Sequence, residues 1–199
     1  MKTVYAILIA ALLASTASAT YYLDERFEGS QFPPAGWELL ATTHANWYQQ
    51  SGPPPDGAYA FGYASTPETR DATAYANLVA PSFILPAPGT LYYRFRYTTT
   101  ATTRALPGRS VAGEFYLYYV DTSEPLVDLI FDDVIYTWEE ATGSTPAAGG
   151  RAIRAAWRVE YGLTIPGAFI FCVDTCQVND EPMTAATPAS LGRVKALFR

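Results

Sequence analysis

Hydrophobic and polar residues alternate with a period of two along much of the chain. In residues 91–97, Leu or an aromatic residue occupies every second position, and in 153–161 apolar residues alternate mainly with Arg, Ala and Glu. In residues 58–63, aromatic residues alternate with Ala or Gly. This period is typical of β-strands, whose successive side chains point to opposite faces of a sheet. We therefore expect a chain built mainly of strands.

Three further segments are more continuously apolar, which predicts strands buried on both faces. They are residues 113–120, 126–138 and 169–173. Breaker segments rich in Gly and Pro separate the predicted strands, at 52–57, 86–89, 107–108 and 143–150. No segment before residue 180 shows a sustained helical period. Several strands without intervening helices predict an all-β fold, an antiparallel jelly-roll β-sandwich in one domain.

The predicted sandwich has a core of large apolar side chains from several strands. We expect these to lie between the two sheets: Trp37, Phe95, Trp157, Val159 and Phe171.

The first 19 residues have the organisation of a signal peptide. Lys2 precedes an apolar stretch at 4–14, and Ala17-Ser18-Ala19 provides the small residues of a cleavage site. The apolar stretch is shorter than the roughly 20 residues that span a membrane as a helix. We expect cleavage after Ala19 and a secreted or cell-surface protein without a membrane span. The predicted organisation is a signal peptide at 1–19, a domain at 20–179, and a linker with a short tail at 180–199.

The charge of the predicted mature chain is acidic. Without Lys2, 12 basic residues stand against 19 acidic residues, a net charge of −7. Phosphate contacts dominate the affinity of proteins for nucleic acids, so an acidic chain without a basic cluster is not expected to bind them. Tyrosine is abundant and methionine is scarce, with 15 and 2 residues respectively, a balance that favours strands.

Few residues are available for catalysis. His44 is the only histidine, so a His-based zinc site is excluded and a Ser-His-Asp arrangement would depend on this one residue. The acidic pairs 132–133 and 139–140 are adjacent residues, which point to opposite faces of a strand and do not form a dyad by themselves. We expect no enzyme, although carboxylates from different strands of a small jelly-roll glycoside hydrolase or lyase remain an alternative.

Cys172 and Cys176 are the only cysteines, and an oxidising compartment would permit a disulfide between them. In an extended strand their Cα atoms would be roughly 13 Å apart, at about 3.3 Å per residue. A disulfide needs less than about 7 Å, so the chain would have to turn at residues 173–175. Two buried free thiols and an intermolecular bridge are the alternatives.

The most specific motif is F-E-G at 27–29 followed by F-P-P-A-G-W at 32–37, with a second tryptophan, Trp47, soon afterwards. This motif resembles the opening of cleaved-adhesin and choice-of-anchor J domains, which are similar in fold to MAM domains. Weaker similarity continues through 77–83, 91–97 and 169–178. The resemblance implies an antiparallel jelly-roll module of bacterial surface and secreted proteins, which binds or adheres without catalysis.

The same resemblance implies a structural calcium ion that bridges the first and last strands. The matching positions are Glu28 and Asp174. Calcium takes six to eight oxygen ligands at about 2.3–2.6 Å. Two departures from the family stand against it, because residues 41–46 contain no carboxylate and Thr175 replaces a second Asp. The alternative is that both carboxylates are satisfied by backbone donors or Arg.

The leading functional hypothesis is a non-catalytic binding or adhesion module for an extracellular glycan or protein. Trp47 and Tyr48 are the candidate ligand-binding residues, and core packing is the alternative for both. A second hypothesis is a structural subunit of a surface layer or filament that self-associates through strand edges or the tail. Residues 189–199 resemble the end of many secreted bacterial proteins, except that Leu191 replaces a Trp.

Overall fold

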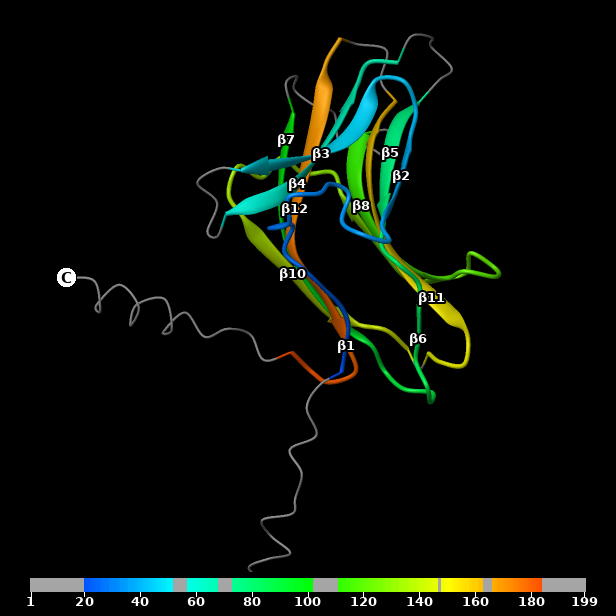
Figure 1. Cartoon of the computed structure of the whole chain (residues 1–199). Helices are drawn as coiled ribbons and strands as arrows, with labels where there is room; N and C mark the ends of the chain where they lie inside the picture. Colours follow the sequence, from blue (N-terminus) through cyan, green and yellow to red (C-terminus); the bar gives the residue numbers. More distant parts are fainter. Residues whose placement is uncertain are drawn as a thin grey trace, which may run out of the picture.

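Two antiparallel six-stranded β-sheets pack face to face in this protein (Figure 1). The computed structural model describes residues 20–51, 57–67, 73–101, 111–146, 148–162 and 166–183. Sheet A has the strand order β10-β7-β12-β4-β3, with β1 paired to β12. Sheet B has the order β2-β5-β11-β8-β9, with β6 paired to β11. This architecture confirms the predicted all-β, antiparallel jelly-roll β-sandwich.

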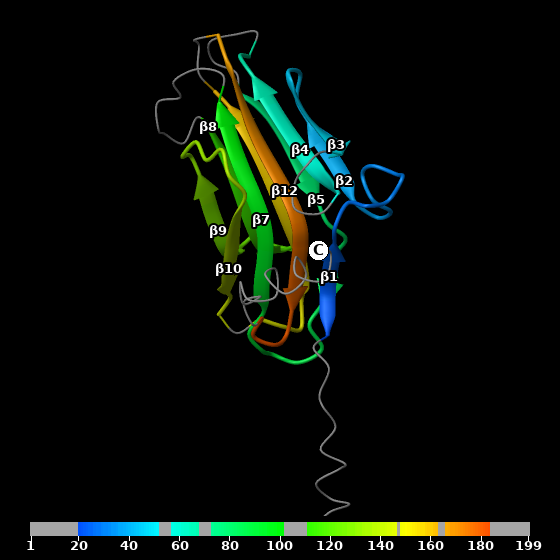
Figure 2. The ribbon, with the colours of Figure 1, turned by 90° about the vertical axis from the view of Figure 1, so that its left-hand side faces the viewer.

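The strands of each sheet come from distant parts of the sequence. Sheet A consists of β1 (Tyr21–Glu25), β3 (Ala45–Ser51), β4 (Ala58–Ser65), β7 (Tyr92–Ala101), β10 (Glu139–Ser144) and β12 (Ala168–Asn179). Sheet B consists of β2 (Glu38–Ala41), β5 (Ala74–Val79), β6 (Phe83–Ile84), β8 (Val111–Tyr119), β9 (Pro125–Phe131) and β11 (Ala152–Tyr161). Figure 2 shows β7 and β12 side by side in the middle of sheet A, as their long antiparallel register requires.

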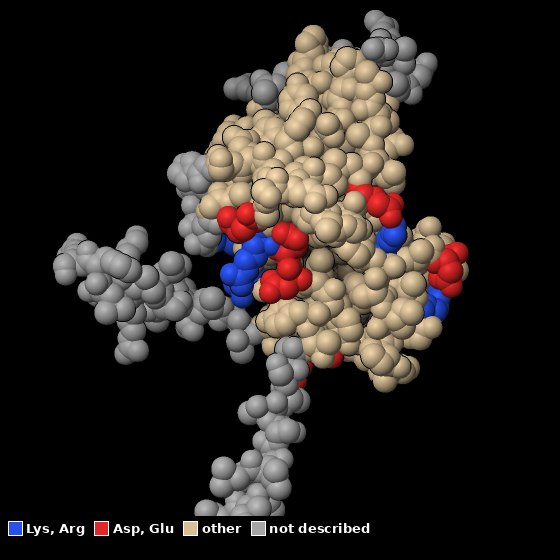
Figure 3. Space-filling model, viewed as in Figure 1, with Lys and Arg blue, Asp and Glu red and all other residues tan. Residues whose placement is uncertain are grey.

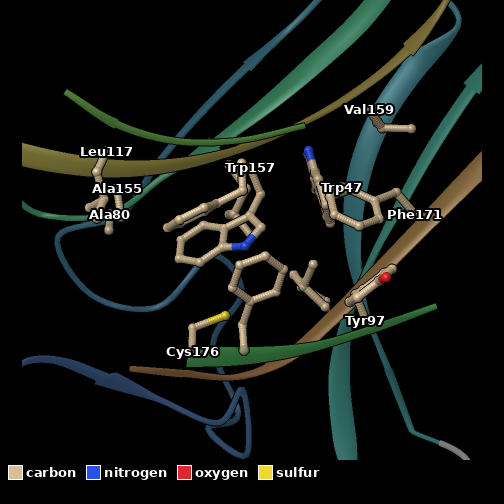
Figure 4. Packing of buried hydrophobic residues seen from close by; sticks show 14 of the residues in the cluster. Trp47, Ala80, Tyr97, Leu117, Ala155, Trp157, Val159, Phe171 and Cys176 are labelled. Atoms are coloured by element: carbon tan, nitrogen blue, oxygen red, sulfur yellow. The ribbon is translucent and has the colours of Figure 1, made fainter. Parts of the chain in front are cut away.

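The predicted core residues lie between the sheets. Trp37, Phe95, Trp157, Val159 and Phe171 are all buried. Many of the core contacts join aromatic rings, which pack at 4.4–6.3 Å between centroids in edge-to-face, tilted and stacked arrangements (Figure 4). Each large aromatic ring buries more apolar area than an aliphatic side chain, so these contacts contribute strongly to the stability of the core.

The P-P-A-G-W segment forms a tight turn that places Trp37 at one end of this core. The Trp37 amide donates to the Pro34 carbonyl at 3.0 Å, and Gly36 has a φ of 81°, a left-handed conformation that glycine adopts without steric cost. The Trp37 ring stacks on Trp157 at 5.7 Å and meets Phe27 edge to face at 5.5 Å. The most specific sequence motif therefore fixes a corner of the sandwich.

The expectation that residues 126–138 form a strand buried on both faces is wrong. Strand β9 ends at Phe131 and lies at the edge of sheet B, where it pairs only with β8. The following residues cross to sheet A, where Ile135 and Thr99 exchange backbone hydrogen bonds at 3.1 Å in both directions. The run is apolar because side chains on both sides of this crossing, such as Leu129, Phe131 and Ile135, pack against the core.

The two ends of the domain lie close together. The start of β1 and the end of β12 are at the same end of the sandwich (Figures 1 and 2). Asp180, assigned to the linker from the sequence, contacts Thr20 and Tyr22. The predicted signal peptide and residues 184–199 of the tail lie outside the described residues. Within the described part of the chain, no helix has the length and apolar character needed to cross a membrane.

Candidate functional site: the aromatic face of sheet A

Strand β4 turns its aromatic side chains away from the core. Its small residues Ala60, Gly62 and Ala64 face inward, so the intervening Tyr59, Phe61 and Tyr63 lie on the outer face of sheet A, half-buried. Gly62 is required because Trp47 and Phe171 occupy the space above it. A Cβ at position 62 would lie 2.9 Å from Trp47 ring carbons and 2.9 Å from the Phe171 carbonyl oxygen.

Neighbouring strands extend this set of rings across the sheet. Tyr48 on β3 is paired with Phe61 and is 51% exposed. Trp138, just before β10, meets Tyr59 edge to face at 5.3 Å. Because β12 and β7 lie between β4 and β10, these two rings meet above the middle of the sheet. We call these residues the aromatic face: Tyr48, Tyr59, Phe61, Tyr63 and Trp138.

Cys172 lies beneath the aromatic face, and it does not pair with Cys176. Both cysteines are free and buried, so the disulfide that the sequence left open is not formed. The chain does not turn back at residues 173–175, because β12 continues through both cysteines. A bulge in β12 between Asp174 and Gln177, with Thr175 at a φ of 52°, also changes the alternation of faces. Cys176 therefore points into the core with Phe171 (Figure 4), whereas Cys172 is outside that cluster. The structure favours two buried free thiols, one of the alternatives left open.

Burial suppresses the reactivity of both thiols. It raises the pKa of Cys172 to about 12 and raises that of Cys176 well above its ordinary value. The thiolate is the reactive form of cysteine, so neither group is poised for redox or nucleophilic chemistry. Burial also raises the pKa of Tyr59, with a smaller contribution from the neighbouring Cys172.

Charged side chains on the same face are paired with one another. Arg94 of β7 donates to Glu140 of β10 at 2.7 Å. Arg96 faces Glu140 on one side and Asp174 of β12 on the other in the strand register. Figure 3 shows the same tendency, because acidic and basic side chains gather together and most of the visible surface is uncharged. Among the residues that the structure describes, this face therefore carries no excess of positive or negative charge that would select a charged ligand.

The structure separates the two predicted ligand-binding residues. Trp47 is 1% exposed, and its indole nitrogen donates to the Ala76 carbonyl at 2.9 Å. Its assignment as a ligand-binding residue is therefore wrong, because the small residues of β4 leave room for its ring in the core. Tyr48 is the next residue along β3, so its side chain points to the opposite face. It remains a candidate.

Glu28 and Asp174, predicted as calcium ligands, are brought near each other. Asp174 is 2% exposed, and its carboxylate accepts the Thr175 amide at 2.6 Å. Burial is the main cause of its raised pKa, and the negative charge of Glu28 adds to the shift while Arg96 opposes it. Glu28 is exposed and accepts the Ala58 amide at 3.0 Å.

Two backbone carbonyls converge beside Glu28. The Gln49 side-chain amide donates to the carbonyl oxygens of Phe27 and Gly29, at 2.5 and 2.6 Å. Calcium is bound by backbone carbonyl oxygens together with carboxylates and water. However, the described residues contain no group of three or more Asp, Glu, His or Cys side chains arranged to hold a metal. Two carboxylates and two carbonyls fall short of the six to eight oxygen ligands that calcium takes, and calcium binding stays a prediction.

Glu139 and Glu140 do not form a catalytic pair. Glu139 accepts the hydroxyl of Tyr97 at 3.1 Å, and burial followed by this bond raises the Tyr97 pKa to about 12. Glu140 points to the other face and pairs with Arg94. His44, exposed at a φ of 68°, lies between β2 and β3.

Sequence reasoning missed four members of the aromatic face: Tyr59, Phe61, Tyr63 and Trp138. The signal was present in residues 58–63, where every residue between the aromatics is Ala or Gly. One face of such a strand carries large rings and the other carries only Ala or Gly. The packing of Trp47 against Gly62 determines that the face with the small residues turns inward.

Comparison with known proteins supports the fold alone. No protein-family model and no curated protein matches this chain. A similar solved structure is the K1 cleaved adhesin domain of Lys-gingipain from Porphyromonas gingivalis W83. It has 18% identity and a TM-score of 0.50, over 82% of this chain and 99% of that one.

Two carbohydrate-binding modules are similar to a comparable degree. TmCBM61, solved in complex with β-1,4-galactotriose, has 14% identity and a TM-score of 0.52, over 81% of this chain and 99% of that one. The CBM22-1 xylan-binding domain of Paenibacillus barcinonensis Xyn10C has 12% identity and a TM-score of 0.51, over 83% and 98%. This chain therefore has the β-sandwich fold of cleaved adhesin domains and carbohydrate-binding modules.

Proposed function

We propose that this protein is a non-catalytic extracellular binding module that binds an uncharged glycan on the aromatic face of sheet A. The observation that carries the proposal is the set of outward rings from β3, β4 and the segment before β10. Aromatic rings present flat apolar surfaces that stack on the C–H faces of sugars, and their few rotatable bonds make ordering them inexpensive. Similarity to an adhesin domain and to two carbohydrate-binding modules supports the proposal.

The polar side chains beside these rings fit an uncharged ligand. Asn46 and Gln50 flank Tyr48 on the outer face of β3, and the phenol hydroxyls of Tyr48 and Tyr63 lie on the same face. Amide and hydroxyl groups both donate and accept hydrogen bonds, as sugar hydroxyls do. Because Arg94 is already paired with Glu140, a charged sugar would have to displace that pair.

A glycan array probed with the mature protein tests the proposal. We expect binding to neutral polysaccharides, and Tyr48→Ala and Tyr63→Ala should each weaken it by about tenfold or more, which corresponds to about 1.4 kcal/mol. Tyr118→Ala is the matched control, because Tyr118 is a half-buried tyrosine on the outer face of sheet B. Absence of glycan binding, or an equal loss in the control, would contradict the proposal. Self-association without glycan binding would support the structural-subunit alternative instead.

We further propose that calcium binds at Glu28 and Asp174 and stabilises the junction between the first and last strands. The supporting observations are the proximity of the two carboxylates and the converging carbonyls of Phe27 and Gly29. A ligand that binds only the folded state raises its melting temperature. Calorimetry of chelator-treated protein should show this rise on addition of millimolar calcium, and an unchanged melting temperature would remove the ion.

A further inference from the structure

The backbone of Thr20, the first residue of the predicted mature chain, contacts a carboxylate that follows the last strand of the domain. The backbone nitrogen of Thr20 donates to Asp180 Oδ1 at 2.9 Å. The hydroxyl of Tyr22 donates to the other oxygen, Oδ2, at 3.2 Å. Both oxygens of this carboxylate are thus directed at β1, the strand that begins directly after Thr20.

Tyr22 connects this contact to the second sheet. Its ring stacks on Phe83 of β6 at 5.1 Å with an interplanar angle of 22°, and β6 belongs to sheet B. Burial is the largest cause of the raised pKa of Tyr22, followed by the charge of Asp180 and its hydrogen bond. The contact at Thr20 therefore joins β1, the end of β12 and an edge of sheet B.

We propose that the Asp180 carboxylate and the Tyr22 hydroxyl form a receiving site for the α-ammonium group that leader removal creates on Thr20. Hydrolysis adds water across the Ala19–Thr20 amide bond. Ala19 leaves with the new carboxylate, and the nitrogen of Thr20 becomes an amine, which takes up a proton at neutral pH. The neutral amide donor is thereby replaced by a cation, so the hydrogen bond to the Asp180 carboxylate gains the attraction between two opposite charges.

The neighbouring charges favour the cation. Asp24 of β1 accepts a hydrogen bond from the Gln177 side-chain amide at 3.1 Å, and Arg26 Nε lies 3.9 Å from the same carboxylate oxygen. Glu181 follows Asp180 in the sequence, and β6 contributes no charged residue. The Asp180 carboxylate, which is in hydrogen-bond contact with the Thr20 nitrogen, should raise the pKa of the α-amino group, because an opposite charge stabilises the protonated form. We therefore expect that pKa above the ordinary range of about 7.7–8.0.

The raised pKa links processing to stability. A group whose pKa is higher in the folded state contributes stability that is complete below its unfolded pKa, and the contribution is lost as the pH rises through the folded pKa. Processed protein should therefore melt at a higher temperature than protein without the cation, below about pH 8. Because the contact between Thr20 and Asp180 is exposed, we expect only a small change in the melting temperature. The pKa of the Thr20 α-amino group is therefore the more sensitive measurement.

The test compares four proteins that begin at residue 20: the wild type and Asp180→Asn, each with a free amine and each acetylated on Thr20. NMR titration of the α-amino group should give a pKa above about 8 in the wild type and within about 7.7–8.0 in Asp180→Asn. The melting temperature of the free-amine wild type should exceed that of the acetylated protein near neutral pH. This difference should vanish above about pH 10 and should be absent from the same comparison in Asp180→Asn.

Two results would overturn the proposal. An ordinary α-amino pKa in the wild type, or the same raised pKa in Asp180→Asn, would show that Asp180 does not receive the cation. Mass spectrometry of exported protein tests the processing step separately. A first residue other than Thr20 would break the link between the site and leader removal, whatever the titration shows.

Discussion

Strands β4 and β7 belong to the same sheet, one on each side of β12, and both alternate aromatic residues with smaller or polar ones. In β7 the aromatic residues Tyr93, Phe95 and Tyr97 point into the core, and Arg94 and Arg96 point outward. In β4 the arrangement is reversed, because Ala60 and Gly62 point inward and the aromatic residues point outward. The same alternation thus builds the core in one strand and an aromatic surface in the other.

The residues between the aromatics restrict the orientation of β7 but not that of β4. Long charged side chains such as Arg94 and Arg96 cannot be buried without large desolvation costs, so β7 must turn its rings inward. Ala and Gly have no such requirement and fit either face. In β4 the inward side is determined by Trp47, whose ring from β3 fills the space above Gly62. Aromatic rings that a core does not need become available for binding.

The largest expected effect comes from truncating an inward ring of β7. Phe95 contacts the rings of Phe115 at 4.7 Å and Trp157 at 5.9 Å and is fully buried. Phe95→Ala should lower the free energy of unfolding by roughly 3–5 kcal/mol, because it leaves a cavity. Denaturant titration measures this loss. Phe61→Ala on β4 is the comparison, and an equal loss there would show that the two strands do not differ as described.

A smaller effect should follow from adding one methyl group to the inward face of β4. Gly62→Ala places a Cβ against the Trp47 ring and the Phe171 carbonyl, and overpacking of this kind costs about 1–3 kcal/mol. The control is Gly29→Ala, whose Cβ would meet nothing within 4 Å. The control should change stability by no more than about 0.5 kcal/mol in thermal and denaturant unfolding. A neutral Gly62→Ala would mean that Trp47 does not occupy this space.

Asp174, on β12 between the two strands, should show an effect on the order of 1 kcal/mol whose sign depends on pH and calcium. Its pKa is raised mainly by burial, so without metal its contribution to stability is complete at low pH and is lost as the pH rises through the folded pKa. Asp174→Asn should therefore stabilise chelator-treated protein at neutral pH and abolish any stabilisation by calcium. Thermal unfolding with and without calcium measures both. Loss of stability in the chelator-treated variant would contradict this account.

The smallest effect on stability is expected at the surface of β3. Tyr48 is half-exposed and points away from the core, so Tyr48→Ala should change the free energy of unfolding by no more than about 0.5 kcal/mol. The same substitution should weaken glycan binding, as proposed above. Denaturant titration paired with a binding isotherm separates the two roles. A large loss of stability would indicate that Tyr48 supports the fold rather than a ligand.

Much of the fold was predictable from local patterns. The alternation in 91–97 and 153–161 placed Phe95, Trp157 and Val159 in the core, and the P-P-A-G-W segment placed Trp37 at a corner. These predictions succeeded because charged neighbours or a turn with specific backbone requirements left one physical solution. The state of Cys172 and Cys176 was left open by the sequence, because it depended on whether the chain turns at residues 173–175. Strand β12 continues through these residues, and a bulge at Thr175 places the two thiols on opposite faces, a displacement that no local pattern reports.

The antiparallel β-sandwich could be predicted from local patterns, because period-two alternation and frequent breakers favour strands over helices. Which residues reach the surface of sheet A depends instead on how the strands pack against one another. Trp47 and Tyr48 are adjacent and equally aromatic, yet one lies in the core and the other faces solvent. That choice depends on the space that Gly62 leaves on the neighbouring strand, and such space exists only when the strands are packed together.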